Sequence, residues 1–191
     1  MAVLNVHERL LPAGPAAVGA LLDSLATDAD RLWPGADWPP MRLSDGLTPG
    51  SHGGHGPVRY TVCAYVPGQW VRFTFSGPRG FHGFHEYTVH PVDTEHTLLR
   101  HTLAMRARGP ARLTWPLLYR HLHDAVLEDS LDHAEHAITG QVARPARWSR
   151  YVRLLRQLAR GSRTSQQESP HAGPQGAASI ATSSAAGRIP R

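Results

Sequence analysis

The stretch from residue 56 to residue 106 constrains the fold of this chain more than any other. It contains four runs in which apolar and polar residues alternate: 56–66, 70–76, 81–92 and 97–106. Short segments of turn-forming residues, such as Pro67-Gly68, separate the runs. Alternation with a period of two is typical of strands that bury one face, and short turns join such strands as antiparallel neighbours. The sequence therefore predicts a four-stranded antiparallel meander.

The residues around this meander predict further elements. Before it we expect a strand over 3–11, an apolar helix over 16–26, a short helix over 28–33, a weak strand over 41–47 and a flexible turn over 48–56. After it, the longest helical pattern of the chain runs from Arg112 to Ile138. One side of this helix is rich in acidic residues and the other is mostly apolar. The apolar side is expected to pack on the sheet.

The charge of the chain is unevenly distributed. The formal net charge is +5 at pH 7, and all 20 basic residues are arginine. Residues 1–140 contain 11 arginines and 14 acidic residues, whereas residues 141–191 contain 9 arginines and 1 acidic residue. The basic character therefore belongs to the C-terminal part of the chain.

Residues 141–160 predict an amphipathic basic helix. One face carries Arg150, Arg153, Arg156 and Arg160, and the opposite face carries Trp148, Val152 and Leu155. Such a helix can lie on an anionic membrane surface, or it can dock on the preceding domain through its apolar face. No nucleic-acid motif accompanies the arginines, so we expect no nucleic-acid partner. Residues 161–191 are rich in Ser, Gly, Ala, Pro and Gln and are predicted to be disordered.

The motifs in the meander carry a family resemblance. The stretch Gly56-Pro-Val-Arg-Tyr-Thr-Val-x-x-Tyr-x-Pro-Gly-x-x-Val-x-Phe-x-Phe and the stretch Gly83-x-His-x-Tyr-x-Val-x-Pro91 resemble the SRPBCC superfamily, which is START-like and includes polyketide cyclases and dehydrases. The resemblance covers roughly residues 2–140. It implies an α+β helix-grip fold, in which a curved antiparallel sheet wraps around a long C-terminal helix and encloses a deep, mostly apolar cavity. The chain is then organised as a ligand-cavity domain (1–140), a basic helix (141–160) and a tail (161–191).

The candidate site lies on the concave faces of the last two strands. His85 and His101 share those faces with apolar residues, so both should point into the cavity from neighbouring strands. The long helix projects further polar side chains into the same space. The predicted ligand-binding residues are His85, Tyr87, His101, Tyr119, His123 and Ser130. A few convergent polar groups in an apolar cavity are typical of a small-molecule site.

Four interpretations of these histidines remain open at this point. They can satisfy hydrogen bonds in the core, or they can orient a carbonyl or hydroxyl of an apolar guest. One can act as a general base, with Tyr119 as proton donor, for cyclisation or dehydration of a polyketide-like substrate. Zinc held by His85, His101 and His123 is the fourth, but no ligand spacing supports it. The sequence favours binding of a lipid or polyketide-like molecule, with no metal or cofactor. Whether the chain is an enzyme stays open, and a cyclase or dehydratase is the alternative.

The location of the protein is predicted from what the sequence lacks. Cys63 is the single cysteine and cannot form an internal disulfide. The N-terminal residues lack the basic and apolar regions of a signal peptide, and no apolar run approaches the roughly 18 residues of a membrane span. We therefore expect a cytoplasmic protein. The oligomeric state and the identity of the ligand stay open.

Overall fold

The computed structural model describes the backbone of residues 1–167 and the side chains of residues 1–159. The chain divides into two compact units, Met1–Arg156 and Gln157–Arg191. The first unit contains the sheet, the long helix and the candidate site. Most of the predicted disordered tail, residues 168–191, lies outside the described part.

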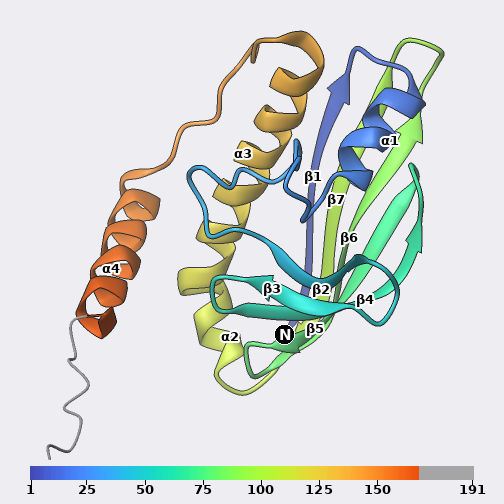
Figure 1. Cartoon of the computed structure of the whole chain (residues 1–191). Helices are drawn as coiled ribbons and strands as arrows, with labels where there is room; N and C mark the ends of the chain where they lie inside the picture. Colours follow the sequence, from blue (N-terminus) through green and yellow to red (C-terminus); the bar gives the residue numbers. More distant parts are fainter. Residues whose placement is uncertain (168–191) are drawn as a thin grey trace, which may run out of the picture. The chain divides into compact units, whose positions relative to one another are not determined.

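The first unit is built on one antiparallel sheet of seven strands (Figure 1). The strands are β1 (Ala2–Leu11), β2 (Arg42–Leu47), β3 (His52–His55), β4 (Val58–Val66), β5 (Trp70–Gly77), β6 (Phe81–Pro91) and β7 (Thr97–Ala107). Their order in the sheet is β1-β7-β6-β5-β4-β3-β2. The predicted meander is confirmed as β4 to β7. The glycine-rich stretch 48–56 is more ordered than predicted, because β3 lies within it and pairs with β2 and β4.

Between β1 and β2 the chain forms one short helix where the sequence predicts two. Helix α1 (Pro15–Asp23) is confirmed, but residues 28–33 form turns rather than a helix. The carboxylate of Asp30 explains the difference, since it accepts hydrogen bonds from the backbone N–H groups of Ala26, Leu32 and Trp33, each at 2.8 Å. A side chain that satisfies nearby backbone donors competes with the helical pattern. This loop leads into β2.

The long helical pattern forms three consecutive segments. These are α2 (Ala111–Thr114), a π-helical turn η1 (Trp115–Tyr119) and α3 (Arg120–Thr139). Pro116, which has no backbone N–H, lies in the π-helical turn. Helix α3 ends at Gly140, whose φ of 76° is left-handed and whose N–H bonds to the His136 carbonyl at 2.8 Å. Apart from the short α2–η1 start, the predicted long C-terminal helix is confirmed.

The sheet and α3 bury the faces that the sequence predicts. On β6 and β7 the side chains of Phe81, His85, Tyr87, Leu99, His101, Leu103 and Met105 are buried. On α3 the buried residues are Val126, Leu127, Ser130, Leu131 and Ala134. These faces meet in the core, and α3 runs across the concave side of the sheet (Figure 1). The expected helix-grip architecture is therefore confirmed.

The basic helix begins later than the sequence predicts. Residues 141–149 form no helix, and α4 covers Arg150–Gln167, so it also continues beyond residue 160. Pro145 disfavours helix at the residue before it. In addition, the carboxylates of Glu135 and Asp132 accept hydrogen bonds from the backbone N–H groups of Ala143 and Ala146, at 3.0 and 2.6 Å. The segment after Gly140 is thereby held along α3 in a non-helical path.

The start of α4 docks on the first unit. The indole N–H groups of Trp38 and Trp148 donate to the same carboxylate oxygen of Asp129, at 2.6 and 2.7 Å. The guanidinium of Arg156 lies 4.2 Å from the Trp38 ring centroid and 3.8 Å from that of Trp148, and it donates to the Asp37 carbonyl. Val152 is buried in the same core.

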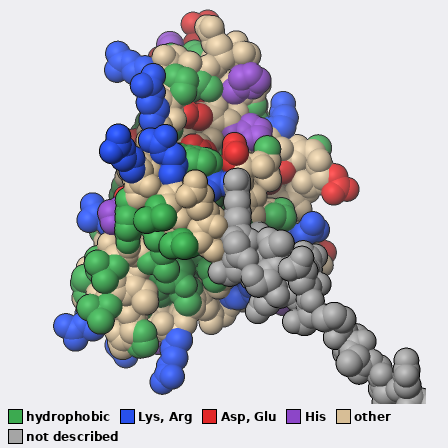
Figure 2. All heavy atoms as spheres, turned by 90° about the vertical axis from the view of Figure 1, so that its left-hand side faces the viewer, with side chains coloured by type: hydrophobic (Ala, Val, Ile, Leu, Met, Phe, Trp, Pro, Cys, Tyr) green, Lys and Arg blue, Asp and Glu red, His purple; other side chains and the backbone are tan. Residues whose placement is uncertain are grey.

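This docking corrects one part of the predicted membrane surface. Arg156 is only 8% exposed and therefore does not face a lipid surface. Arg150 and Arg153 are exposed, and for them the membrane surface stays a prediction; the side chain of Arg160 lies outside the described part. Arginines on the face shown in Figure 2 form several separate groups, with acidic and histidine side chains between them. None of the helices in the described residues has the length and apolar character needed to cross a bilayer.

The docking contacts of Trp148 predict a stabilising role for the segment after Gly140. Replacement of Trp148 by Ala removes the hydrogen bond to Asp129 and the ring contacts with Trp38 and Arg156. Because Trp148 is half-buried, we expect a loss of about 2 kcal/mol in the free energy of unfolding, and a melting temperature lower by roughly 4–8 °C. Thermal unfolding followed by circular dichroism measures this. Arg153→Ala, on an exposed position of α4, is the control and should change little; equal melting of all three proteins would contradict the docking role.

Candidate functional site

A row of aromatic and imidazole rings crosses the interior of the first unit. We call it the histidine row, and it comprises His55, Tyr60, His85, His101, His123 and His7. Successive ring centroids lie 5.9, 4.8, 5.4, 5.2 and 5.9 Å apart. The members come from β3, β4, β6, β7, α3 and β1 in that order. Curvature of the sheet around α3 thus brings together rings that are distant in the sequence.

His85 and His101 are directly hydrogen-bonded. In the β6–β7 register His101 pairs with Tyr87 and His85 pairs with Leu103, so the two histidines are diagonal neighbours on one face. His85 Nδ1 and His101 Nε2 lie 3.2 Å apart. The prediction that these side chains are within reach of each other on the concave face is confirmed.

This hydrogen bond determines what the pair offers to a guest. His85 Nε2 and His101 Nδ1 are buried and have no hydrogen-bond partner among the described residues. If His85 donates in the shared bond, its Nε2 is a bare acceptor and His101 Nδ1 carries a proton; if His101 donates, the roles are reversed. In either tautomer the neutral pair presents one donor and one acceptor. One nitrogen at each end of the pair is thus left for a polar group of a guest or for a water molecule.

Burial keeps every histidine of the row except His7 neutral. His85 and His101 are 6% and 2% exposed, and burial lowers the pKa of both imidazoles well below the ordinary value, with a further contribution from neighbouring histidines. Burial also lowers the pKa of His55 to about 3, and it lowers the pKa of His123 despite the nearby Asp124 carboxylate. His85 stacks between the rings of Phe73 and Phe75, at 4.9 and 5.1 Å. The space around His85 is therefore filled by aromatic side chains, and a deep internal cavity stays a prediction.

The remaining predicted site residues are placed in two ways. Tyr87 and Ser130 are buried beside His101 but satisfy each other, since their hydroxyls lie 2.9 Å apart and Ser130 also donates to the Leu32 carbonyl. Tyr119 belongs to a second core cluster, where its ring lies 5.1 Å from Phe81. Ring contacts connect Phe81 to His85 through Phe75 and to His123 through Trp115. Thus His85, His101 and His123 come together, Tyr87 and Ser130 lie beside them, and Tyr119 lies apart.

Three members of the histidine row were not predicted from the sequence. Tyr60 is buried, its hydroxyl has no hydrogen-bond partner in the described part of the chain, and burial raises the pKa of that hydroxyl. The alternation of 56–66 gives a signal for Tyr60, because it shares a face with Val62. His55 was interpreted as part of a solvated turn but packs 4.6 Å from the Trp33 ring. His7 lies on the polar face of β1, where hydrophobicity gives no signal.

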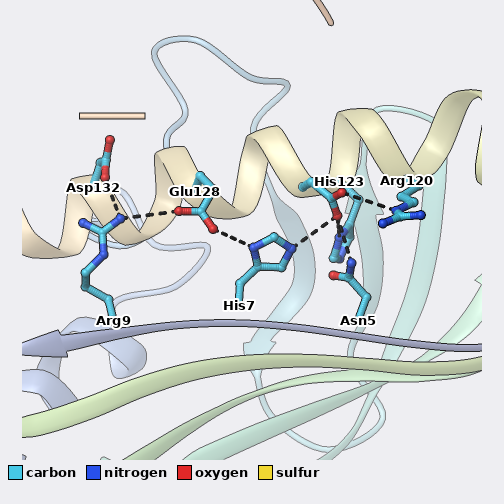
Figure 3. A network of polar contacts seen from close by, with 8 residues as sticks. Asn5, His7, Arg9, Arg120, His123, Glu128 and Asp132 are labelled. Carbon is cyan, nitrogen blue, oxygen red and sulfur yellow. Dashed lines mark hydrogen bonds and ion pairs between the residues drawn. The ribbon is translucent and has the colours of Figure 1, made fainter. Parts of the chain in front are cut away.

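At its outer end the histidine row joins a line of charged and polar contacts between β1 and α3, which we call the polar seam (Figure 3). Its members are Asn5, His7 and Arg9 from β1 and Asp124, Glu128, Asp132 and Glu135 from α3. His7 Nδ1 lies 2.7 Å from Glu128, and His7 Nε2 lies 3.3 Å from Asp124. Arg9 binds Asp132 at 2.9 Å and also bonds to Glu135.

The spacing of strand and helix explains why these contacts form a continuous line. Alternate residues of a strand lie about 6.6 Å apart, and residues four apart on a helix lie about 6 Å apart. Asn5, His7 and Arg9 therefore match Asp124, Glu128 and Asp132 one to one. Burial alone would lower the pKa of His7, but hydrogen bonds and charges of Asp124 and Glu128 raise it. Contacts with His123, His7 and Asn5 hold the pKa of the Asp124 carboxyl below its ordinary value, against the effect of burial.

A surface pocket lies beside the seam. It has a volume of about 270 Å³ and is lined by Met1, Ala2, Val3, Leu4, Asn5, Trp115, Pro116 and Arg120. Asn5 donates to Asp124 at 2.9 Å, and the Trp115 ring lies 5.7 Å from His123. The predicted site residues do not line this pocket, but His123 is adjacent to it through Trp115. Close by, the ligand atoms of His7, His123 and Asp124 lie within 4.8 Å of one another, as a metal ion would require.

Comparisons with known proteins identify neighbours by structure rather than by sequence. No family model and no curated protein matches this chain. CalU16 from Micromonospora echinospora superposes with a TM-score of 0.53 and 14% identity, covering 88% of this chain and 90% of that one. A conserved protein of unknown function from Enterococcus faecalis gives 0.53 and 16%, covering 86% of each chain. A START superfamily protein from Mycobacterium smegmatis gives 0.51 and 13%, covering 72% of this chain and 97% of that one.

The lowered pKa values predict how stability depends on pH. Between the folded and unfolded pKa values of His85 and His101, the unfolded chain binds protons that the folded chain does not. The free energy of unfolding should therefore fall as pH decreases below about 6.5, by up to about 1.4 kcal/mol per pH unit for each histidine. His7, whose pKa is raised, acts oppositely: its contribution is complete below about pH 6.5 and is lost as pH rises through its folded pKa.

Urea denaturation at pH 7.5, 6.0 and 5.0 tests this. His85→Phe keeps the stacking with Phe73 and Phe75 but removes one titrating group. The decrease in the free energy of unfolding on acidification should therefore become smaller, by up to about 1.4 kcal/mol per pH unit. His82→Phe, an exposed position on the same strand, is the matched control and should leave the pH dependence unchanged. An identical pH dependence in His85→Phe and the unmodified protein would contradict the neutral, buried state of His85.

Proposed function

We propose that this chain, whose fold is the START-like helix-grip fold of the SRPBCC superfamily, binds a hydrophobic small molecule between its sheet and α3. Members of this superfamily use that space for lipids, sterols or polyketides. The observation that carries the proposal is a set of buried imidazole nitrogens that find no hydrogen-bond partner among residues 1–159: His85 Nε2, His101 Nδ1 and both ring nitrogens of His123.

Unpartnered buried polar atoms favour a guest because they are costly in its absence. Each such atom destabilises the folded state by about 1–3 kcal/mol. The atoms lie among rings of Tyr60, Phe73, Phe75 and Tyr87, which offer apolar contact on the remaining sides. A molecule that is mostly apolar and carries hydroxyl, enol or carbonyl groups would supply hydrogen-bond partners that the His85–His101 pair lacks. A purely aliphatic guest would leave the pair unsatisfied.

The pocket of about 270 Å³ at the start of β1 supports a route toward these groups. Val3 and Trp115 give it an apolar wall, and Trp115 separates it from His123. Its volume is slightly below the range of about 300–1,000 Å³ that is usual for small-molecule sites. We infer that the guest occupies the pocket and displaces Trp115 or its neighbours to contact His123 and His101.

A cyclase or dehydratase activity is the second candidate, and the His85–His101 pair is the observation that favours it. If the bare outer nitrogen takes a proton from a substrate, the shared proton can move to the other ring, and that ring can release a proton from its own outer nitrogen; the pair then stays neutral. Two features weigh against this candidate. The lowered pKa makes each imidazole a weak base, and Tyr119, the expected proton donor, packs against Phe81 instead.

Binding is tested first by extracting the purified protein with organic solvent and examining the extract by mass spectrometry. We expect a co-purified apolar molecule with at least one hydroxyl or carbonyl oxygen. The affinity for the fluorescent apolar probe 8-anilinonaphthalene-1-sulfonate is then measured with His101→Phe and the control His82→Phe. Because His101→Phe removes the outer Nδ1 of this ring, the yield of the co-purified molecule should fall at least about tenfold, equivalent to one lost hydrogen bond of about 1.4 kcal/mol.

The probe separates loss of polarity from loss of the apolar site. His101→Phe should bind 8-anilinonaphthalene-1-sulfonate as well as the unmodified protein while losing the co-purified molecule, and His82→Phe should retain both. An empty extract together with no binding of the probe would refute the proposed function. Equal yields from His101→Phe and the unmodified protein would show that the histidine pair does not hold the guest.

A further inference from the structure

We propose that His7, His123 and Asp124 form a binding site for a divalent transition-metal ion of the zinc class, with a coordination position left for a ligand from the adjacent pocket. This inference does not rest on the proposed function. It starts from three side chains on two elements, β1 and α3, whose ligand atoms all lie within 4.8 Å of one another.

The distances are close to those of a coordinated site. Asp124 Oδ1 lies 3.3 Å from His7 Nε2 and 3.7 Å from His123 Nδ1. Metal bonds of 2.0–2.1 Å in a tetrahedron place neighbouring ligand atoms about 3.3 Å apart. Small side-chain rotations would therefore bring all three atoms to one ion. Two imidazole nitrogens and one carboxylate oxygen suit Zn²⁺ and Co²⁺ better than Mg²⁺ or Ca²⁺, which prefer oxygen ligands.

His123 supplies an independent reason to place an ion here. Both of its ring nitrogens are buried, and neither has a hydrogen-bond partner among the described residues. Burial also lowers the pKa of His123, so the ring is neutral and its lone pair is available. Asn5 Oδ1, which lies on the same side of the seam, is likewise buried without a hydrogen-bond partner. A cation between these groups would satisfy atoms that the polar seam leaves unsatisfied.

The surroundings have the features of an outer coordination shell. His7 Nδ1 lies 2.7 Å from Glu128, which is the carboxylate contact that usually orients a metal-bound imidazole. Asn5 donates to Asp124 at 2.9 Å and Arg120 lies 3.7 Å from its other oxygen, so the Asp124 carboxylate is held in place (Figure 3).

The pocket provides the fourth position. Asn5, Trp115 and Arg120 line it, and these three residues contact Asp124 or His123. Three protein ligands with one open position are typical of zinc sites that bind water or an exchangeable ligand. The positive charge of Arg120 at the pocket favours an anionic or oxygen-bearing molecule on the metal.

Titration of the full-length protein with ZnCl₂ alone, followed by isothermal calorimetry, tests the site. We expect one equivalent to bind, and CoCl₂ to give the visible absorption of a tetrahedral nitrogen–oxygen site. His7→Gln, His123→Ala and Asp124→Asn should each abolish this component. Glu128→Gln, which alters the contact to His7 and a 3.5 Å contact to Arg9 but removes no proposed metal ligand, should weaken it by about 10–100-fold.

Two matched controls separate a metal site from general effects. Asp132→Asn removes a seam carboxylate that binds Arg9 but lies outside the proposed site, and His133→Ala removes another histidine of α3; both should bind Zn²⁺ as the unmodified protein does. Circular dichroism and thermal melting without metal verify that each variant is folded. If a histidine variant unfolds, the site is still tested by the isosteric Asp124→Asn and by Glu128→Gln, which changes a residue that contacts the ligand His7.

Two results would overturn the inference. One is the lack of Zn²⁺ binding by the unmodified protein at 100 μM metal. A site whose dissociation constant is roughly tenfold below that concentration would be almost fully occupied. The other is binding of equal affinity in the three ligand variants and the two controls. Because neither measurement uses an apolar guest, failure of the metal site leaves the proposed function standing, and the reverse also holds.

Discussion

The polar seam is the interaction on which the rest of the first unit depends. Strand β1 lies at the edge of the sheet, and α3 contacts it through charged and polar side chains rather than through an apolar stripe. The seam holds α3 along β1 through several contacts at once, since Asn5, His7 and Arg9 each bind a carboxylate of the helix. The position of α3 in turn places His123 beside His101 and places Ser130 beside Tyr87. A shift of α3 by one turn would separate both contacts.

The seam also divides the histidine row electrostatically. At the outer end, Asp124 and Glu128 favour the protonated form of His7, whereas burial among aromatic rings favours the neutral form of His85 and His101. His123 lies between the two environments, 5.9 Å from His7 and 5.2 Å from His101 in ring centroids. It is therefore the member at which an apolar guest from one side and a cation from the other would meet. Both proposals concern this residue for that reason.

How far sequence reasoning reached depended on whether hydrophobicity and burial agree. In β6 and β7 they do, so the concave faces and the proximity of His85 and His101 were predictable. In β1 they do not: Leu4, Val6 and Leu10 are 73%, 45% and 53% exposed, and the polar alternate residues face α3. The role of Asn5, His7 and Arg9 depends on partners in α3 that lie more than a hundred residues away in the sequence. No local sequence pattern reveals such partners. The same applies to Tyr119, because the π-helical turn that contains it alters the helical wheel on which its direction was predicted.

The carboxylates of α3 explain why the ordered domain extends beyond the part that resembles the superfamily. Asp132 and Glu135 hold Arg9 on one side and, on the other, accept hydrogen bonds from the backbone of residues 143 and 146. Asp129 accepts from Trp38 and Trp148, and burial raises the pKa of this carboxyl despite those two bonds. Removing residues 141–156 would take one partner from each of these three carboxylates and expose the Trp38 ring. Part of the acidic excess of residues 1–140 is thus used inside the unit, where Asp129, Asp132 and Glu135 accept hydrogen bonds from neutral N–H donors of the C-terminal segment.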